Sequence, residues 1–282
     1  MILTLEKPLL YKTVPEHLRH VQRKLVHPSG MSVELLDWMG NDIDVVNAAR
    51  VSFGKESYYD SWVHSPLHPG IITVKDWQNC KEHIHPPIFP WMIIPLLNVK
   101  DEGLINYLMR ERHGTPFEMV QFKFRVRAPI CVVWEWVRHR IASYNVMSTR
   151  YVDWDKDYYT PEAAEWRKQV GKAGHYEFVP LGDHSEMELT YVKAMEQAFE
   201  YYGLLLEQGL AREVARNVLP MGAMTEFIWS VNLRSMFNFL SLREAENALQ
   251  EIQLCATMVR ELATLVVPVA MQKWEEHGRR NP

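Results

Sequence analysis

Cysteine is scarce in this chain of 282 residues, which contains only Cys80, Cys131 and Cys255. Because their number is odd and they lie far apart, the sequence predicts neither a disulfide framework nor a paired-cysteine metal site. Cys131 and Cys255 lie in apolar runs, whereas a nucleophilic cysteine needs nearby cations or a helix N-terminus to lower its pKa. We expect both thiols to be reduced and to pack in the core.

Long apolar segments and an excess of positive charge are also missing. No stretch approaches the roughly 20 apolar residues that a membrane-spanning helix needs, and the N-terminus has no basic leader before an apolar run. We therefore expect a cytoplasmic protein, or one in the host cytoplasm if the source is a virus. The net charge of −4 disfavours a general nucleic-acid binder, whose affinity rests on a basic surface. The arginines of this chain must act locally.

The composition is that of a globular protein, since 47% of the residues are hydrophobic. We predict a single domain over residues 1–282, interrupted at about 58–100 by a stretch rich in His, Pro and Trp. The prolines there prevent long regular elements, so we interpret the stretch as an inserted surface lobe. Its histidines are expected to be surface residues, and no metal site is predicted; they are His64, His68, His83 and His85.

Hydrophobic periodicity predicts both helices and strands. A period near 3.6 indicates helices over Asp101–Arg112, Pro129–Arg138, Glu186–Gln208, Ala211–Leu219 and Glu244–Glu276. Alternation of apolar and polar residues indicates strands over 120–127 and 225–231, while residues 32–39 fit either a strand or a helix. The fold class that fits is α+β: a small, largely antiparallel sheet with helices packed around it and long helices at the C-terminus.

Residues 138–150 gather three arginines, a histidine and small polar residues in thirteen positions, RHRIASYNVMSTR. Guanidinium groups present planar forks of donors that match phosphate, and hydroxyls with loop amides can complete such a cage. The segment therefore predicts a ligand that carries phosphate. The predicted helix ends at Arg138, and a helix C-terminus favours cations whatever the function, but that explains one arginine and not the whole group.

Five segments, in order along the chain, resemble the flavin-dependent thymidylate synthase family. Arg138-His139-Arg140, followed after seven residues by Ser148, resembles the signature of that family. Residues 49–55 (ARVSFGK) resemble its first signature loop, and 113–118 (HGTPFE) its H-x-[ST]-P-F-E element. Residues 211–220 are similar to its A-R-E-x-A-R-x-x-L-P run, and residues 231–243 to its V-N-x-R-S-x-x-N-F-x-x-x-R block.

The resemblance implies an enzyme that methylates dUMP to dTMP. Methylene-tetrahydrofolate would supply the carbon and FAD reduced by NADPH the hydride, without a cysteine nucleophile, while the protein binds, orients and activates. It also implies a homotetramer whose subunits share their pockets. The residues that the resemblance places at FAD are Thr115, Arg138, His139, Arg140, Asn232, Leu233, Arg234 and Asn238. Asparagine suits flavin carbonyls and ring nitrogens, because it both donates and accepts hydrogen bonds.

The resemblance also assigns the dUMP site and its catalytic residue. Ser148, Arg150 and the loop amides would hold the phosphate. Arg243 would be catalytic, because a fixed guanidinium stabilises the negative charge that develops when N3 of uracil ionises. We favour a nucleotide contact for Glu135 over an ion pair with Arg138, three residues further along the same helix face. The full set is Glu135, Arg138, Val146, Met147, Ser148, Thr149, Arg150, Arg216 and Arg243.

Three positions depart from the family pattern. Val146 stands where the family usually has Glu or Gln, and Asn247 and Leu249 stand where many members have His and Gln. Two alternatives therefore stay open: a variant that releases another product, such as a hydroxymethyl nucleotide, and a non-catalytic flavin- or nucleotide-binding protein. The clustered cations argue against the second alternative, since an idle pocket would not need them.

Overall fold

The computed structural model describes residues 23–59, 61–64, 71–73, 93–154, 156–172, 175–280 and 282. Cys80, His68, His83 and His85 lie outside the described residues, as does the side chain of His64. The interpretation of these histidines therefore stays a prediction. None of the described helices is long and apolar enough to cross a membrane.

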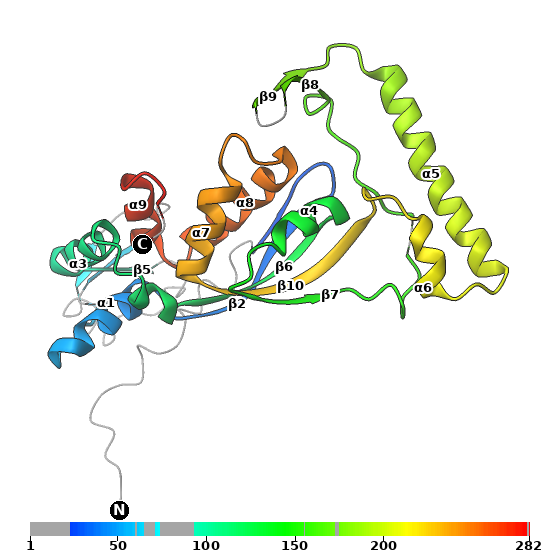
Figure 1. Ribbon diagram of the computed structural model, residues 1–282. Helices are drawn as coiled ribbons and strands as arrows, with labels where there is room; N and C mark the ends of the chain where they lie inside the picture. The colour runs from blue at the N-terminus through cyan, green and yellow to red at the C-terminus, as the bar shows by residue number, and fades with distance from the viewer. Residues whose placement is uncertain are drawn as a thin grey trace, which may run out of the picture.

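A five-stranded antiparallel sheet forms the centre of the molecule (Figure 1). Its strands follow the order β1-β2-β6-β10-β7, with the bounds β1 Lys24–Val26, β2 Ser32–Met39, β6 Gln121–Pro129, β7 Ser143–Val146 and β10 Met224–Asn232. The strands predicted from alternation are confirmed as β6 and β10. Residues 32–39, which fit a strand or a helix, form β2, where they pair with β6.

The two central strands, β6 and β10, each lead directly into a helix. Helix α4 (Ile130–Trp136) follows β6 at Pro129, and α7 (Leu233–Arg243) follows β10 at Asn232, whose side chain accepts from the Ser235 amide at 2.8 Å. Because β6 and β10 are antiparallel over their whole length, the two helices begin at opposite ends of this pair. Both lie over the same face of the sheet (Figure 1). Their C-terminal ends can therefore meet above it.

The core fills the space between this face and the helices. Side chains that alternate along β6 and β10, such as Phe124 and Trp229, are fully buried. Trp136 of α4 packs edge-on against Trp229, with ring centroids 5.2 Å apart. Helix α8 (Gln250–Thr264) covers β2 and contacts both α4 and α7. The predicted fold class, an α+β protein with a largely antiparallel sheet and C-terminal helices, is confirmed.

The prediction of one helix over Glu244–Glu276 is wrong. The chain forms α8 and α9 (Pro268–Glu276), and residues 244–249 are irregular. Pro268 causes the break, because its ring clashes with the carbonyl four residues earlier and it has no N–H to donate, whereas it fits the first turn of α9. The predicted helix 211–219 is also shorter, with α6 (Arg212–Ala215) followed by the 3-10 turn η6 (Arg216–Val218) before Pro220.

Other predicted helices are shifted by one or two residues. The helix expected over Asp101–Arg112 is α3 (Val99–Arg110), which is capped by the Asn98 side chain, and Glu186–Gln208 corresponds to α5 (Ser185–Glu207). Helix α1 (Asp42–Arg50) continues into the 3-10 turn η3 (Val51–Phe53), and η5 (Thr115–Met119) precedes β6. Apart from α5, which lies at the opposite end of the molecule, these elements gather near the end of the sheet at which α7 begins (Figure 1).

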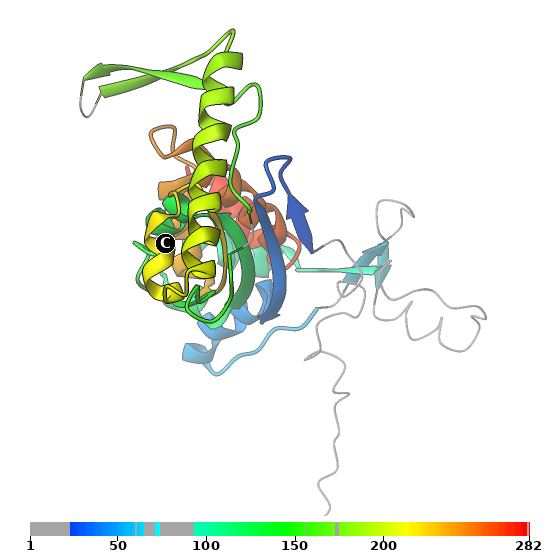
Figure 2. The ribbon, with the colours of Figure 1, turned by 90° about the vertical axis from the view of Figure 1, so that its right-hand side faces the viewer.

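Two smaller sheets stand apart from the central one. The hairpin β8 (Arg167–Lys172) and β9 (His175–Pro180) projects from the body beside α5, as both views show (Figure 2). Strands β3 (Ser61–His64), β4 (Ile71–Thr73) and β5 (Ile93–Leu96) form a three-stranded sheet in the order β4-β3-β5. These three strands fall within the stretch interpreted as an insertion, and the division into one domain with an insertion stays a prediction.

Asp42 joins the first and last described helices. Its carboxylate oxygens accept from the backbone N–H groups of Val269 and Ala270, both at 2.9 Å, in the first turn of α9. These N–H groups have no partner within their own helix. Asp42 is only 3% exposed, and this burial raises its pKa to about 7 despite the two backbone bonds.

We predict that Asp42 makes the stability of the fold depend on pH. A carboxyl pKa raised in the folded state contributes stability below the ordinary value of 3.8, and this contribution is lost as the pH rises through about 7. Relative to Asp42→Asn, the free energy of unfolding of the unmodified protein should fall by at least about 1.4 kcal/mol, the equivalent of one pKa unit, between acidic and mildly alkaline pH. Urea unfolding followed by tryptophan fluorescence measures the free energy of unfolding at each pH. The variant Asp37→Asn, at an exposed position, serves as the control. A difference that stays flat or grows with pH would contradict this role.

Candidate active site

A cavity of about 500 Å³ lies where β10 passes into α7 and where α4 returns to β7. Its walls include Trp229 and Val231 from β10, residues 138–142 from the loop, and the outer side of α7. The structure thus brings together seven of the residues predicted from sequence: Arg138, His139, Arg140, Asn232, Arg234, Asn238 and Arg243. These come from segments about a hundred residues apart, and the sequence alone gives no distance between them.

Arg243, in the last turn of α7, is held by three hydrogen bonds. Its Nη1 donates to Glu135 Oε2 at 2.7 Å, its Nη2 to the Glu135 carbonyl at 2.9 Å, and its Nε to His139 Nε2 at 2.8 Å. The side chain is 17% exposed. A guanidinium has five N–H donors, so two are left for a ligand in the cavity. Glu135 therefore pairs across the helices with Arg243 and has no ion pair with Arg138.

His139 is neutral in this arrangement. Burial, and after it the neighbouring Arg243 guanidinium, lowers the pKa of His139 to about 4, below its ordinary value of 6.5. A neutral imidazole can accept the Arg243 N–H at Nε2 while its proton resides on Nδ1. The ring also packs edge-on against Phe239, with centroids 4.9 Å apart. His139 therefore orients Arg243 and adds no charge of its own at neutral pH.

The remaining arginines give the cavity its positive charge. Within the described part of the chain, Arg138 and Arg140 form no ion pair, whereas Arg234 pairs with Glu118. Arg234 lies against the backbone at Gly114, where a Cβ would come within 2.3 Å of the Arg234 Nε. Glycine at this position leaves room for the arginine. Sequence reasoning gave no role to Glu118 or Gly114, although both belong to the 113–118 element.

The predicted phosphate-binding residues form a second group. Strand β7 pairs with β10 so that Ser143 lies opposite Ser230 and Val146 opposite Phe227, which directs the chain away from the cavity. At about 3.3 Å per residue, Ser148 lies roughly 17 Å beyond Ser143 if the chain stays extended. Near α6 and η6, Arg216 Nη1 donates to Thr149 Oγ1 at 2.9 Å.

Other contacts in the second group lie close to the same turn. The Met147 amide donates to the Glu226 carbonyl at 2.9 Å, and Arg150 pairs with Glu213 at 3.1 Å, both side chains being exposed. Ser148, Thr149, Arg150 and Arg216 do not line the cavity that holds Arg243. Within one chain the predicted nucleotide site is therefore divided into two halves.

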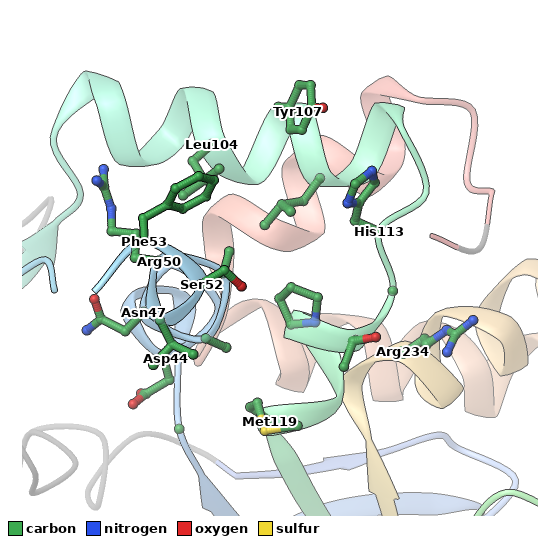
Figure 3. Close-up of a pocket in the computed structure, with 18 of the residues that line it drawn as sticks. Asp44, Asn47, Arg50, Ser52, Phe53, Leu104, Tyr107, His113, Met119 and Arg234 are labelled. Carbon is green, nitrogen blue, oxygen red and sulfur yellow. The ribbon is translucent and has the colours of Figure 1, made fainter. Parts of the chain in front are cut away.

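Three predicted residues take other places. Leu233 is fully buried, its amide donates to the Val120 carbonyl at 2.9 Å, and it does not line the cavity. Thr115 lies in a larger neighbouring cleft of about 1840 Å³, which also contains the 49–55 loop (Figure 3). Val146 points its exposed side chain from β7 without a polar contact. Their predicted ligand contacts stay predictions.

The two cysteines that the structure describes are unsuited to nucleophilic catalysis. Cys255 is fully buried, which raises the pKa of its thiol to about 12, and burial also raises the pKa of Cys131. Both thiols are therefore protonated at neutral pH. Among the described residues, no three His, Cys, Asp or Glu side chains gather to form a possible metal site.

The protein is an α+β protein with a central antiparallel sheet. Its two middle strands continue into helices whose C-terminal ends meet at an arginine-rich cavity. The family described as "Thymidylate synthase complementing protein", Thy1, matches residues 34–269. The flavin-dependent thymidylate synthase of Thermus thermophilus is 39% identical over 245 residues, 87% of this chain and 76% of the relative. That of Tropheryma whipplei is 40% identical over 265 residues, 90% and 96% of the two chains. This chain belongs to the flavin-dependent thymidylate synthase family, which confirms the resemblance.

A solved structure supports the same relationship. The UMP/dUMP methylase PolB from Streptomyces cacaoi, bound with 5-Br UMP, is 32% identical in sequence. It superposes with a TM-score of 0.71 and covers 92% of this chain and 99% of its own. The chain therefore shares both fold and family with nucleotide methylases.

We predict that Arg243 contributes mainly to turnover and Arg234 mainly to the binding of flavin, so that substituting each has a different effect. Arg243→Ala should lower turnover by about 10²–10³ and leave flavin bound, because a preorganised donor at a developing charge is worth that much. Arg234→Ala should instead weaken flavin retention by about tenfold, the value of one charged hydrogen bond. Flavin absorbance after gel filtration and kcat measure the two effects. Reversed phenotypes would show that the residue assignments are wrong.

Proposed function

We propose that the protein is a flavin-dependent thymidylate synthase that converts dUMP to dTMP. Methylene-tetrahydrofolate is the carbon donor and FAD reduced by NADPH is the hydride source. The observation that carries this proposal is Arg243, which is fixed by Glu135 and His139 at the wall of a cavity whose neighbouring cations, Arg138 and Arg140, have no carboxylate partner among the described residues. The family membership supports it.

The cavity residues fit FAD by their chemistry. The unpaired guanidinium groups of Arg138 and Arg140 suit a pyrophosphate, which binds such forks of donors. The exposed amide of Asn238 makes no hydrogen bond within the described structure and can both donate and accept, as a flavin ring edge requires. Trp229 and Val231 provide an apolar wall. Reduced FAD supplies the hydride that turns the transferred carbon into a methyl group.

Arg243 acts on the pyrimidine in this proposal. Its two remaining N–H groups bind the uracil edge and stabilise the negative charge that develops when N3 loses its proton. Because Glu135 and His139 fix the guanidinium beforehand, no reorganisation is needed during the reaction. Because His139 is neutral, it orients the Arg243 guanidinium without neutralising its positive charge. C5 then becomes nucleophilic without a cysteine, in agreement with the protonated state of both described thiols.

The complete nucleotide site requires a second subunit. Arg243 lies in one half of the divided site, whereas Ser148, Thr149, Arg150 and Arg216 form the other half, near α6. We propose that in a homotetramer the 147–150 turn of one subunit faces the Arg243 cavity of another, where Ser148 and Arg150 hold the nucleotide phosphate. Helix α5 supports such assembly, because only Phe199 and Tyr202 of its 23 residues are buried in the single chain.

A second candidate substrate is UMP. The solved relative PolB is described as a UMP/dUMP methylase, and it resembles this chain over nearly its whole length. Methylation of either nucleotide removes the hydrogen at C5 as a proton, so the same measurement tests both. The nature of the product also distinguishes methylation from release of a hydroxymethyl nucleotide.

We predict release of tritium from dUMP labelled at C5 when the protein, FAD, NADPH and methylene-tetrahydrofolate are combined. The expected product is dTMP, identified by mass spectrometry, and the rate should be higher than with labelled UMP. Omission of methylene-tetrahydrofolate provides the control for methyl transfer. Bound flavin without tritium release from either nucleotide would refute the enzymatic proposal, and a hydroxymethyl product would replace it by the variant reaction.

A further inference from the structure

The loop that carries His139 into the site buries little of its own surface. Residues 137–142 connect α4 to β7, and four of these six residues are exposed, while only His139 and Ala142 are partly buried. Burial of apolar surface therefore contributes little to the conformation of this loop. Its shape depends on the polar contacts that its backbone makes.

The hydroxyl group of Tyr144 makes such a contact. It donates to the His139 carbonyl at 2.6 Å, and the Trp136 carbonyl lies 3.2 Å from the hydroxyl oxygen. Carbonyls at the C-terminal end of a helix have no partner within the helix, so side chains or water have to satisfy them. A hydroxyl has one proton to donate, and the shorter contact, to His139, is therefore the main hydrogen bond. Tyr144 thereby ties the loop to β7.

The Tyr144 side chain is itself fixed by the sheet. Tyr144 lies opposite Trp229 in the pairing of β7 with β10, and its ring packs against the core, with its centroid 6.2 Å from that of Phe227. Burial raises the pKa of Tyr144 to about 12. The hydroxyl therefore keeps its proton, and remains a donor, at neutral and acidic pH.

The bond to the His139 backbone also fixes the His139 ring, because the carbonyl and the ring belong to one residue. The ring accepts from Arg243 at Nε2, at 2.8 Å. The charged groups that face it are Arg243 from α7 and Glu135 from α4, and its neighbours in the loop are Arg138 and Arg140. A shift of the loop backbone would therefore move the acceptor that orients Arg243.

We propose that Tyr144 is a positioning residue for the reaction. Its hydroxyl holds the His139 backbone, the His139 ring holds Arg243, and Arg243 binds the uracil edge. Tyr144 does not line the Arg243 cavity, so it acts only through the other two residues. This role rests on the proposed function, because it takes Arg243 as the group that binds the pyrimidine.

Loss of the hydroxyl should make the site sensitive to acid. In the unmodified protein, burial and, after it, Arg243 lower the pKa of His139 to about 4, so the ring is neutral at any pH well above that value. A loop that is no longer tied to Tyr144 lets the ring reach solvent, and the pKa then rises toward its ordinary value of 6.5. Below that value the imidazolium carries a proton on both nitrogens, so it cannot accept the Arg243 N–H and repels the guanidinium.

The test is calorimetric titration of the flavin-loaded protein with dUMP, one pH unit above and one pH unit below the ordinary histidine pKa. The variant Tyr144→Phe keeps the ring and removes only the hydroxyl. At the higher pH it should bind dUMP up to about tenfold more weakly than the unmodified protein, the value of one neutral hydrogen bond. At the lower pH this ratio should grow by a further factor of about three to ten, because an imidazole with an ordinary pKa is about nine-tenths protonated there. Comparing ratios removes the titration of the nucleotide phosphate, which affects both proteins equally.

Tyr191→Phe is the matched control, because the Tyr191 hydroxyl donates to the Tyr159 carbonyl at 2.9 Å and lies outside the Arg243 cavity. It removes the same kind of bond, and its ratio should be the same at both pH values. A Tyr144→Phe ratio that does not change with pH, even if binding is weaker throughout, would show a general structural effect and overturn the proposal. An unmodified protein that binds dUMP but releases no tritium would refute the proposed synthase reaction, while the two ratios would still decide the role of Tyr144.

Discussion

The site depends on the contact that joins the ends of two helices over the sheet. Helices α4 and α7 begin at opposite ends of the β6 and β10 pair, and their C-terminal turns meet where Arg243 donates to Glu135 and His139. This contact fixes the guanidinium and closes one wall of the cavity, while burial and, after it, the Arg243 charge lower the pKa of His139 and keep the imidazole neutral. Antiparallel pairing is its cause, because a parallel pair would start both helices at the same end.

The same topology explains why one chain holds only half of the proposed nucleotide site. Strand β7 has to run antiparallel to β10, so it carries the 147–150 turn away from Arg243 and toward α6. The proposed sharing between subunits rests on this strand direction, and the long exposed surface of α5 is consistent with assembly. The cavity of Arg243 and the larger cleft that contains Thr115 meet at Arg234, whose position depends on Gly114 and Glu118.

Much of this fold and part of the site could be predicted from the sequence. Alternation of apolar and polar residues identified β6 and β10, whose apolar side chains are buried, and motif spacing identified the arginines of the cavity. The break at Pro268 was missed although proline chemistry predicts it, because the apolar period continues across the break. The pairing of Glu135 with Arg243 is a tertiary contact between residues 108 positions apart, which local spacing cannot reveal. The separation of the 147–150 turn from the cavity likewise depends on sheet register.

Co-expression of two inactive variants tests the shared site most directly. Arg243→Ala and Arg150→Ala each remove one half of the proposed pocket, and Arg150 is exposed, so its loss should not unfold the chain. If the halves come from different subunits, random mixing restores both arginines in about a quarter of the pockets, and tritium release should return to that fraction of the unmodified rate. Mixed oligomers as inactive as either parent would show that both arginines act from the same chain, which would contradict the account.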